Sequence, residues 1–175
     1  MVSLAQATED VLRQGLALLF ELNGKTFAAI APAPYQASIG QHYRHVLDHF
    51  LCLESGIAVG EIAYDDRARD PRLEIDLDFA WSTTERLIRV FGAYHLELLN
   101  RHCSVKYSVG YGSAAPVRLP STVARELAFC IGHAVHHYAI VRLLCDSVGV
   151  GVVPEFGIAP STLKHRAEQS QLDNP

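Results

Sequence analysis

Four long segments of this chain repeat apolar residues at the spacing of an amphipathic helix, and breaker-rich stretches separate them. Each segment has a broad apolar face that it must bury against the others, because little strand pattern lies between them. We therefore predict an all-α fold, a four-helix bundle with a small β-hairpin or irregular insertion before the last long helix. The predicted helices span residues of about 4–22, 38–54, 76–100 and 122–148.

The residues at the ends of these segments are typical helix caps and breakers. Asn23-Gly24 ends the first helix, and the linker 24–35 holds Ala-Pro-Ala-Pro, which cannot continue a helix. Ser38 is a candidate N-cap of the second helix, which is predicted to end just before Gly56. The fourth helix is predicted to stop at Gly149.

The remaining segments are predicted to be loops and a short hairpin. Alternating apolar residues and a glycine-rich turn favour a small hairpin over about 105–119. Segment 64–71 is charged and broken, which is typical of a solvated loop, and the mouth of the site pocket is the alternative role of its charged run. The tail 149–175 turns polar and is expected to lie over the bundle before fraying. We expect a single domain, 1–175, with its bundle over about 4–148.

Composition and motifs exclude several classes of function. The net charge is -4 and the basic residues are scattered, so we expect no nucleic-acid or anionic-membrane surface. We expect no secretory leader, and no segment approaches the roughly 20 uninterrupted apolar residues of a membrane span. The four cysteines lack Cys-x-x-Cys spacing, which favours reduced thiols in a cytoplasmic protein. Serine-hydrolase, Walker A and dinucleotide-binding motifs are missing from the sequence.

Histidine is the most informative residue type, because six of the nine histidines fall within 42–49 and 133–137. In the second predicted helix, His42, His45 and His49 share an arc of roughly 60°. One face of that helix is therefore a row of imidazoles.

In the fourth predicted helix, a similar arc holds Glu126, Cys130, His133 and His137, whereas His136 is turned away. His133 and His137 form an H-x-x-x-H pair on adjacent turns, about 5–6 Å apart at their Cβ atoms. Both can therefore reach a single ion. A third imidazole from another helix would complete a three-histidine site that keeps a position open for water or substrate.

Structural roles without metal binding stay open for these residues. A helical pair of histidines is often a packed or solvated coincidence, although burying several unpaired imidazoles costs free energy that metal ligation relieves. Cys130 is either a soft ligand near the metal or a small core thiol. We expect surface positions for His95, His102 and His165. Arg44 and Arg125 point off the histidine arcs and are assigned no substrate group.

Two segments resemble helices of the DinB/YfiT-like superfamily. Ser38-Ile-Gly-Gln-His-Tyr-Arg-His45-Val-Leu-Asp-His49 is similar to its second-helix signature, in which a Ser begins the helix and a His seven residues later binds metal. Gly132-His133-Ala-Val-His136-His137-Tyr is similar to its later H-x-x-x-H helix. The resemblance implies the metal ligands His45, His133 and His137. The segment 156–162, together with the loop 64–71, looks like a subgroup of uncharacterised bacterial members.

Three histidines of this chain are additional to that triad: His42, His49 and His136. We therefore keep His49 as the main alternative to His45. The resemblance implies a scaffold for a divalent metal that thiol-dependent transferases and isomerases use, and it does not imply one substrate.

The leading hypothesis is a divalent-metal enzyme of hydrolase or thiol-transferase type, with water or a substrate thiolate at the open position. Glu126 or Asp48 would orient a ligand imidazole or act as a base. Zinc or nickel is favoured, with iron or cobalt as further candidates. The expected partners are a small molecule, such as a low-molecular-weight thiol, and a second copy of the chain in a homodimer. The rival hypothesis is a non-catalytic metal-binding or stress-associated interaction protein on the same bundle.

Overall fold

Four long helices dominate the structure, a computed structural model that describes residues 3–32, 34, 36–112 and 115–172. They are α1 (Leu4–Phe20), α3 (Ile39–Val59), α5 (Leu77–Gly92) and α7 (Val123–Val148). Shorter elements connect them: α2 (Gly24–Ala28), the 3-10 helix η1 (Tyr64–Asp66), α4 (Arg72–Ile75) and α6 (Leu96–Leu99). The prediction of a mostly helical fold is confirmed.

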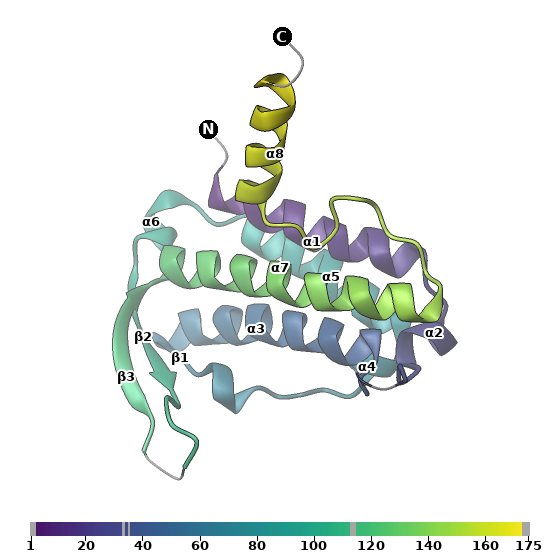
Figure 1. Cartoon of the computed structure of the whole chain (residues 1–175). Helices are drawn as coiled ribbons and strands as arrows, with labels where there is room; N and C mark the ends of the chain where they lie inside the picture. The colour runs from purple at the N-terminus through teal and green to yellow at the C-terminus, as the bar shows by residue number, and fades with distance from the viewer. Residues whose placement is uncertain (1–2, 33, 35, 113–114, 173–175) are drawn as a thin grey trace.

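The long helices pack around one apolar core. α1 contacts α5 and α7, and α3 contacts the same two helices. Figure 1 shows α3 and α7 running side by side. Each long helix contributes fully buried leucines to the core, among them Leu12, Leu47, Leu87 and Leu127. This burial removes apolar surface from water and supplies most of the driving force for folding.

Capping residues fix the ends of the two helices that carry the histidine segments. Ser38 begins α3 with a capping box, in which its hydroxyl accepts from the Gln41 backbone and its own backbone donates to the Gln41 side chain. Thr122 caps α7, which ends at the left-handed Gly149 with a φ of 74°. These caps agree with the sequence prediction.

The second helix is longer than predicted. α3 continues through Gly56 and ends at Gly60, whose φ of 82° is the left-handed conformation typical of a helix C-terminus. Gly56 is needed inside the helix, because a Cβ there would lie 2.7 Å from Ile62 Cγ1. The glycine marks a close approach of the following strand and not a helix end.

The third helix is shorter than predicted. α5 ends at Gly92, and the separate short helix α6 follows after an extended His95. Gly is about 1 kcal/mol less favourable than Ala inside a helix, which weakens the predicted continuation to residue 100. The side chain of Tyr94 instead packs edge-on against Phe91, with 4.9 Å between ring centroids.

A small three-stranded sheet lies beside the helices, so the all-α class is corrected to a mostly helical fold with a sheet. The strands are β1 (Glu61–Ile62), β2 (His102–Tyr107) and β3 (Val117–Thr122), in the order β1-β2-β3. β2 and β3 form the predicted hairpin, extended in both directions, with Val105 opposite Leu119. β1 pairs parallel with β2 and was not predicted, because two residues carry no alternation pattern.

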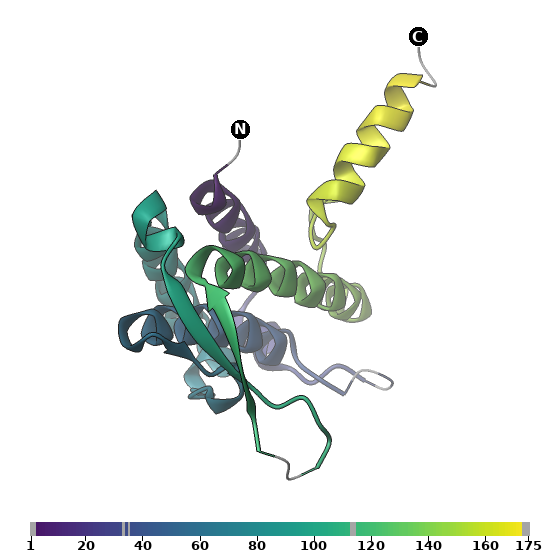
Figure 2. The same cartoon turned by 90° about the vertical axis from the view of Figure 1, so that its left-hand side faces the viewer.

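Two predicted surface segments are partly buried. Segment 64–71 is not a purely solvated loop, because Tyr64 is only 2% exposed. In the tail, Phe156 is buried and stacks on Tyr138 with 4.9 Å between ring centroids. Beyond it, α8 (Pro160–Leu172) has no buried residue and projects away from the bundle, so it does not lie over the bundle as predicted (Figures 1 and 2).

Among the described helices, α7 is the one whose length and hydropathy would allow it to cross a membrane. The helix packs against both α1 and α3 and also carries histidines and charged residues. A core helix of a bundle passes the same test of length and composition.

Candidate metal centre

Five histidines from α3 and α7 form one continuous cluster of rings, which we call the histidine cluster: His42, His45, His49, His133 and His137. The histidine row of α3 faces the H-x-x-x-H pair of α7 because these two helices lie side by side. Neighbouring ring centroids are 3.9–5.3 Å apart. The predicted meeting of the two histidine segments is therefore seen.

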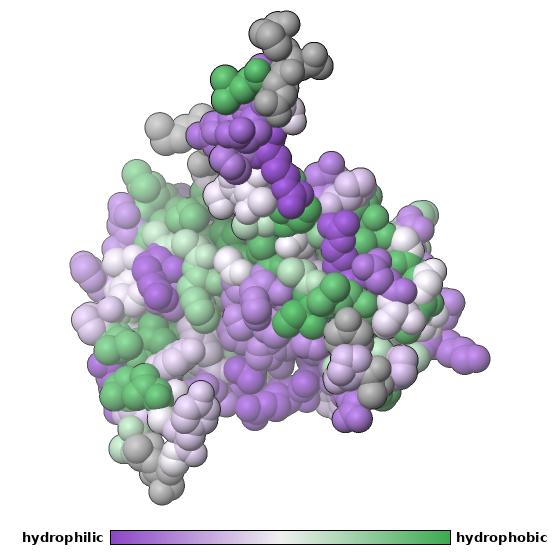
Figure 3. All heavy atoms as spheres, viewed as in Figure 1, coloured by the Kyte–Doolittle hydropathy of each residue, from purple (hydrophilic) through white to green (hydrophobic). Residues whose placement is uncertain are grey.

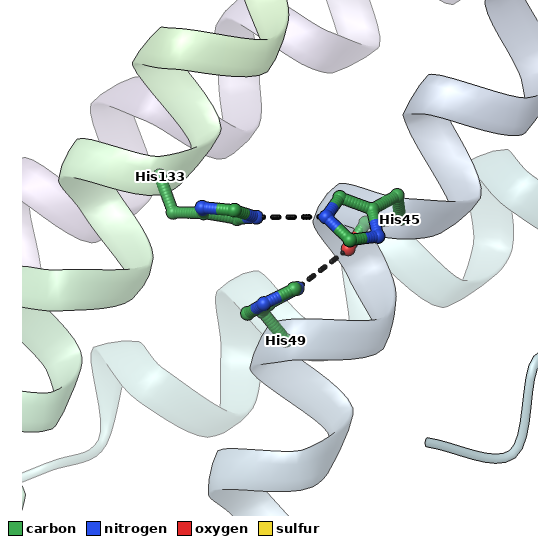
Figure 4. A group of neighbouring side chains, drawn as sticks. All are labelled: His45, His49 and His133. Carbon is green, nitrogen blue, oxygen red and sulfur yellow. Dashed lines mark hydrogen bonds between the residues drawn. The ribbon is translucent and has the colours of Figure 1, made fainter. Parts of the chain in front are cut away.

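Three members of the cluster are placed to share one ion. Ligand nitrogens of His45, His49 and His133 all lie within 4.8 Å of one another. The Nε2 atoms of His45 and His133 are 2.9 Å apart. Figure 4 shows these rings gathered between α3 and α7, with two of them on α3. Since metal–nitrogen bonds are about 2.0–2.1 Å long for zinc, both Nε2 atoms can contact one ion.

A backbone hydrogen bond fixes the tautomer of His49. Its Nδ1 lies 2.8 Å from the carbonyl oxygen of His45, one turn earlier on α3. A carbonyl only accepts, so Nδ1 of His49 carries the proton and donates. The lone pair of a neutral His49 is then on Nε2, which is the arrangement that metal-binding histidines use.

His137 occupies a different place in the cluster. Its ring centroid is 4.4 Å from that of His45 and 4.6 Å from that of His133. Its Nδ1, however, lies 3.0 Å from Nδ1 of His42, in a hydrogen bond between the two rings. The predicted ligand His137 therefore lies in the histidine cluster. The three histidines whose ligand nitrogens lie within 4.8 Å of one another are, however, His45, His133 and the alternative ligand His49. His136 is exposed and turned away from His137, as predicted, although its ring packs edge-on against that of His137 with 5.2 Å between centroids.

The environment keeps these imidazoles neutral at neutral pH. Burial is the main cause that lowers the pKa of each ring, and neighbouring positive charges add to it. The pKa falls to about 3 for His45 and His137, and to about 4 for His49 and His133. A neutral imidazole keeps the lone pair that a metal ligand requires.

Two aromatic rings hold the histidine rings from outside. Tyr64 stacks on His49 with 5.3 Å between centroids, and Phe129 stacks on His133 at 5.6 Å. Tyr64 and Phe129 also line a cavity of about 260 Å³ that β2, β3 and the start of α7 enclose. Sequence reasoning did not single out Tyr64, because it begins a segment in which most of the other residues are charged.

Glu126, a predicted base or orienting group, is buried at the floor of this cavity. Its carboxylate accepts from the hydroxyls of Tyr64 at 3.0 Å and Ser121 at 2.5 Å, and from Arg125 at 3.0 Å. None of these partners is a histidine. Glu126 therefore reaches the histidine cluster through Tyr64, whose ring lies on His49.

Asp48, the other predicted acid, is buried on α3 between His45 and His49 in sequence. Its Oδ2 lies 4.0 Å from Nε of Arg67, which is beyond hydrogen-bonding distance. Burial raises the pKa of Asp48, and the nearby Arg44 and Arg67 work in the opposite direction. Sequence reasoning did not single out Arg67, which belongs to the charged run whose alternative role was the mouth of the pocket.

Cys130 packs against the site as a thiol. Its Sγ lies 3.6 Å from the Tyr64 hydroxyl and 3.7 Å from the carbonyl oxygen of His49. Burial raises the pKa of Cys130 to about 12, which disfavours the thiolate that a soft ligand needs. The positions expected at the surface, His95, His102 and His165, are exposed.

Comparison with known proteins shows which known fold this chain has. No family model matches the chain. Its sequence is 30% identical over 120 residues to FK506-binding protein 5 from Rhizopus delemar, a match that covers 67% of this chain and 30% of that protein. Its structure is similar to a DinB-like protein (YjoA) from Bacillus subtilis, with a TM-score of 0.55 and 16% identity, covering 83% of this chain and 95% of the other. The chain therefore has a DinB-like fold, and the resemblance seen in its histidine segments is confirmed at the level of the fold.

Proposed function

We propose that this chain, whose fold is DinB-like, binds one divalent metal ion through His45, His49 and His133. The observation that carries the proposal is the convergence of three ligand nitrogens within 4.8 Å on neutral imidazoles from two helices. The fixed tautomer of His49 supports it, because the protonated Nδ1 leaves Nε2 free.

We further propose that the ion serves catalysis, in a hydrolase or a thiol-dependent transferase. Three histidine ligands leave a coordination position open, as catalytic sites do. A zinc ion held there would lower the pKa of bound water to about 7 and would favour the thiolate form of a bound thiol, which would supply a nucleophile at neutral pH. The cavity offers space for a small substrate, and the histidine cluster adjoins it through Tyr64 and Phe129, which line the cavity and stack on His49 and His133.

The protein's own residues would hold the ligand rings in place. The carbonyl oxygen of His45 orients His49, while Tyr64 and Phe129 restrict the planes of His49 and His133. Glu126 acts as a positioning residue, because it holds the hydroxyl of Tyr64. The favoured ions are zinc and nickel, with iron and cobalt next, since imidazole ligands suit all four.

The sequence-predicted triad, with His137 in place of His49, is the alternative ligand set. The test is elemental analysis of untagged protein purified without chelator or added metal, for the wild type and four alanine variants. We expect about one ion per chain in the wild type, its loss in His49→Ala and His133→Ala, and its retention in His137→Ala. The exposed His136→Ala is the matched control.

Three other results would change the assignment. Loss of the ion in His137→Ala with retention in His49→Ala would establish the sequence-predicted triad. Loss in every variant, His136→Ala included, would point to a folding defect, which circular dichroism detects. A wild-type protein that takes up no divalent ion on titration would overturn the proposal.

A further inference from the structure

The cavity that adjoins the histidine cluster has an apolar wall that the protein covers only in part. In the hairpin of β2 and β3, Val105 lies opposite Leu119, so the two side chains belong to the same face of the sheet. Both line the cavity of about 260 Å³. Val105 is 6% exposed, whereas Leu119 is 50% exposed. Figure 3 shows hydrophobic residues at the surface over this hairpin. The cavity therefore has open apolar surface on its strand side.

Aromatic rings surround the same space. Tyr64 of η1, Tyr107 of β2 and Phe129 of α7 all line the cavity. The ring centroids of Tyr64 and Phe129 are 5.1 Å apart. Aromatic walls favour an aromatic ligand, because ring pairs add to the gain from burying apolar area. Pockets for drug-sized ligands measure roughly 300–1,000 Å³, so this smaller cavity fits a molecule with a single ring.

The two charged residues of the cavity differ in what they leave free. Glu126 is 1% exposed, and both of its carboxylate oxygens accept hydrogen bonds. Oε2 accepts from Tyr64, and Oε1 accepts from Ser121 and Arg125. The side chain of Arg125 is 66% exposed, and its guanidinium lies 5.5 Å from the ring centroid of Phe129.

Arg125 has donors left for a ligand. A guanidinium carries five N–H donors, and among the described residues Glu126 is the one acceptor of a side-chain hydrogen bond from Arg125. The acceptor at the floor of the cavity is thus occupied, while donors remain free at its exposed rim. An anionic group at the rim matches this arrangement.

We propose that this cavity binds a small aromatic carboxylate, with its ring against Leu119 and Phe129 and its carboxylate on Arg125. A guanidinium pairs with a carboxylate through two parallel N–H···O bonds, which gives the charged end of the ligand a defined place. The carboxylate stays near water at the rim while the ring removes apolar surface from water. An ammonium group in its place would have to displace a donor from Glu126 and lie close to the positive charge of Arg125.

The inference deepens the proposed function, because Tyr64 and Phe129 join this cavity to the rings of His49 and His133. It rests on that function for the role of the ligand as a substrate. Binding itself requires the cavity and not the metal ion, so the two proposals can be tested apart.

The test compares three probes that share a phenyl ring and differ in the charge at the end of a short chain. They are 3-phenylpropionate, the neutral 3-phenylpropanamide and the cationic 3-phenylpropylamine. Ligand-observed NMR titration measures the dissociation constant of each probe for the full chain, once metal-free and once loaded with Zn²⁺. The metal-free measurement excludes binding of the carboxylate to the ion itself. We expect 3-phenylpropionate to bind roughly ten-fold more tightly than the amide, the effect of one charged hydrogen bond, and the amine to bind most weakly.

One pair of variants tests the charged contact. Arg125→Gln should remove the preference for the carboxylate over the amide. Arg118→Gln is the matched control, because Arg118 has a side chain that is 62% exposed, pairs with Glu61 and lies outside the cavity lining. The double variant Arg125→Gln/Glu126→Gln leaves no buried charge unpaired, and it carries the same expectation if the single variant folds poorly.

A second pair of variants tests the place of the ring. Leu119→Trp should abolish binding of 3-phenylpropionate, because the larger side chain fills the cavity. Val117→Trp is its control, since Val117 belongs to the same strand and does not line the cavity.

The outcomes separate this inference from the proposed function. Equal affinities for the carboxylate and the amide, or tightest binding of the amine, would overturn the inference. An equal loss of preference in Arg118→Gln, or unchanged binding in Leu119→Trp, would overturn it as well, because the probe would then bind elsewhere. A Zn²⁺-loaded protein that binds none of the probes would overturn the inference and leave the proposed function standing. A chain that takes up no ion and still prefers the carboxylate would do the reverse.

Discussion

Tyr64 supports the candidate site from outside the two histidine helices. Its hydroxyl donates to the buried carboxylate of Glu126 while its ring lies on His49. We expect Tyr64→Phe to lower the free energy of unfolding by about 1–3 kcal/mol, because a buried carboxylate loses one of its donors. Urea denaturation measures the change, with Tyr107→Phe at a ring that is 38% exposed as the control. Equal stability of Tyr64→Phe and wild type would contradict the prediction.

The sequence alone predicted which residues meet at the site but not how their rings are turned. Helical spacing gave the two histidine faces, and the resemblance to DinB-like helices implied that they meet in one site. The orientation of His49 depends on the carbonyl of His45, and the choice between His49 and His137 depends on a hydrogen bond to His42. Tyr64 and Arg67 could not be found, because their segment has no periodicity and its charges indicate solvent exposure.

At the scale of elements, two glycines in helices have opposite roles. A Cβ at Gly56 in α3 would lie 2.7 Å from Ile62 Cγ1 and 2.8 Å from the Glu61 carbonyl oxygen, whereas at Gly132 in α7 it would meet nothing within 4 Å. We expect Gly56→Ala to destabilise the protein by about 1–3 kcal/mol through overpacking. Gly132→Ala should stabilise it by about 0.5–1 kcal/mol through helix propensity.

Thermal or urea unfolding of both variants measures this contrast. The same substitution in two helices serves as its own control, so helix propensity cannot explain a difference in sign. Stabilisation by Gly56→Ala would show that β1 can move away from α3.

The elements that the sequence predicted well are those with long periodic patterns and strong caps. α1 and α7 begin and end within about two residues of their predictions, which is the usual uncertainty at helix ends. The errors have two different causes. Gly56 resembles a helix end but accommodates β1, a tertiary contact that leaves no trace in the local sequence. The break after Gly92 is local, because glycine weakens the helix there and Tyr94 packs on Phe91 three residues earlier.

At the scale of the whole molecule, the buried imidazoles make the stability of the metal-free protein depend on pH. The pKa of His45 is lowered from 6.5 to about 3 and that of His49 to about 4. At a pH between the lowered pKa values of the folded chain and 6.5, these histidines are protonated in the unfolded chain but neutral in the folded chain. The free energy of unfolding should therefore fall as pH falls below 6.5. Asp48, whose pKa burial raises, opposes the trend in part.

Urea midpoints at pH 7.5, 6 and 5 would measure this dependence. We expect a smaller decrease for His45→Gln, because the variant removes one of the groups that must charge on unfolding. A midpoint that is constant over this range would contradict the lowered pKa values.

Metal removal tests whether the ion supports the fold or only the chemistry. The apolar core runs through all four long helices and includes residues far from the histidine cluster, such as Leu12 and Leu87. We therefore expect chelator-treated protein to keep its helical circular dichroism and a cooperative unfolding transition, with a lower Tm. Collapse of the helical signal would favour a structural ion and the non-catalytic hypothesis.

The ligand nitrogens of His45 and His133 belong to positions 88 residues apart in the chain. During refolding they can meet only after α3 and α7 have docked, since neither helix carries the whole ligand set. Contacts of such long sequence separation form late when chain-closure entropy limits the rate. The visible absorbance of a bound Co²⁺ ion would thus report the time at which α3 and α7 dock. A parallel stopped-flow measurement of far-ultraviolet circular dichroism would report helix formation for comparison.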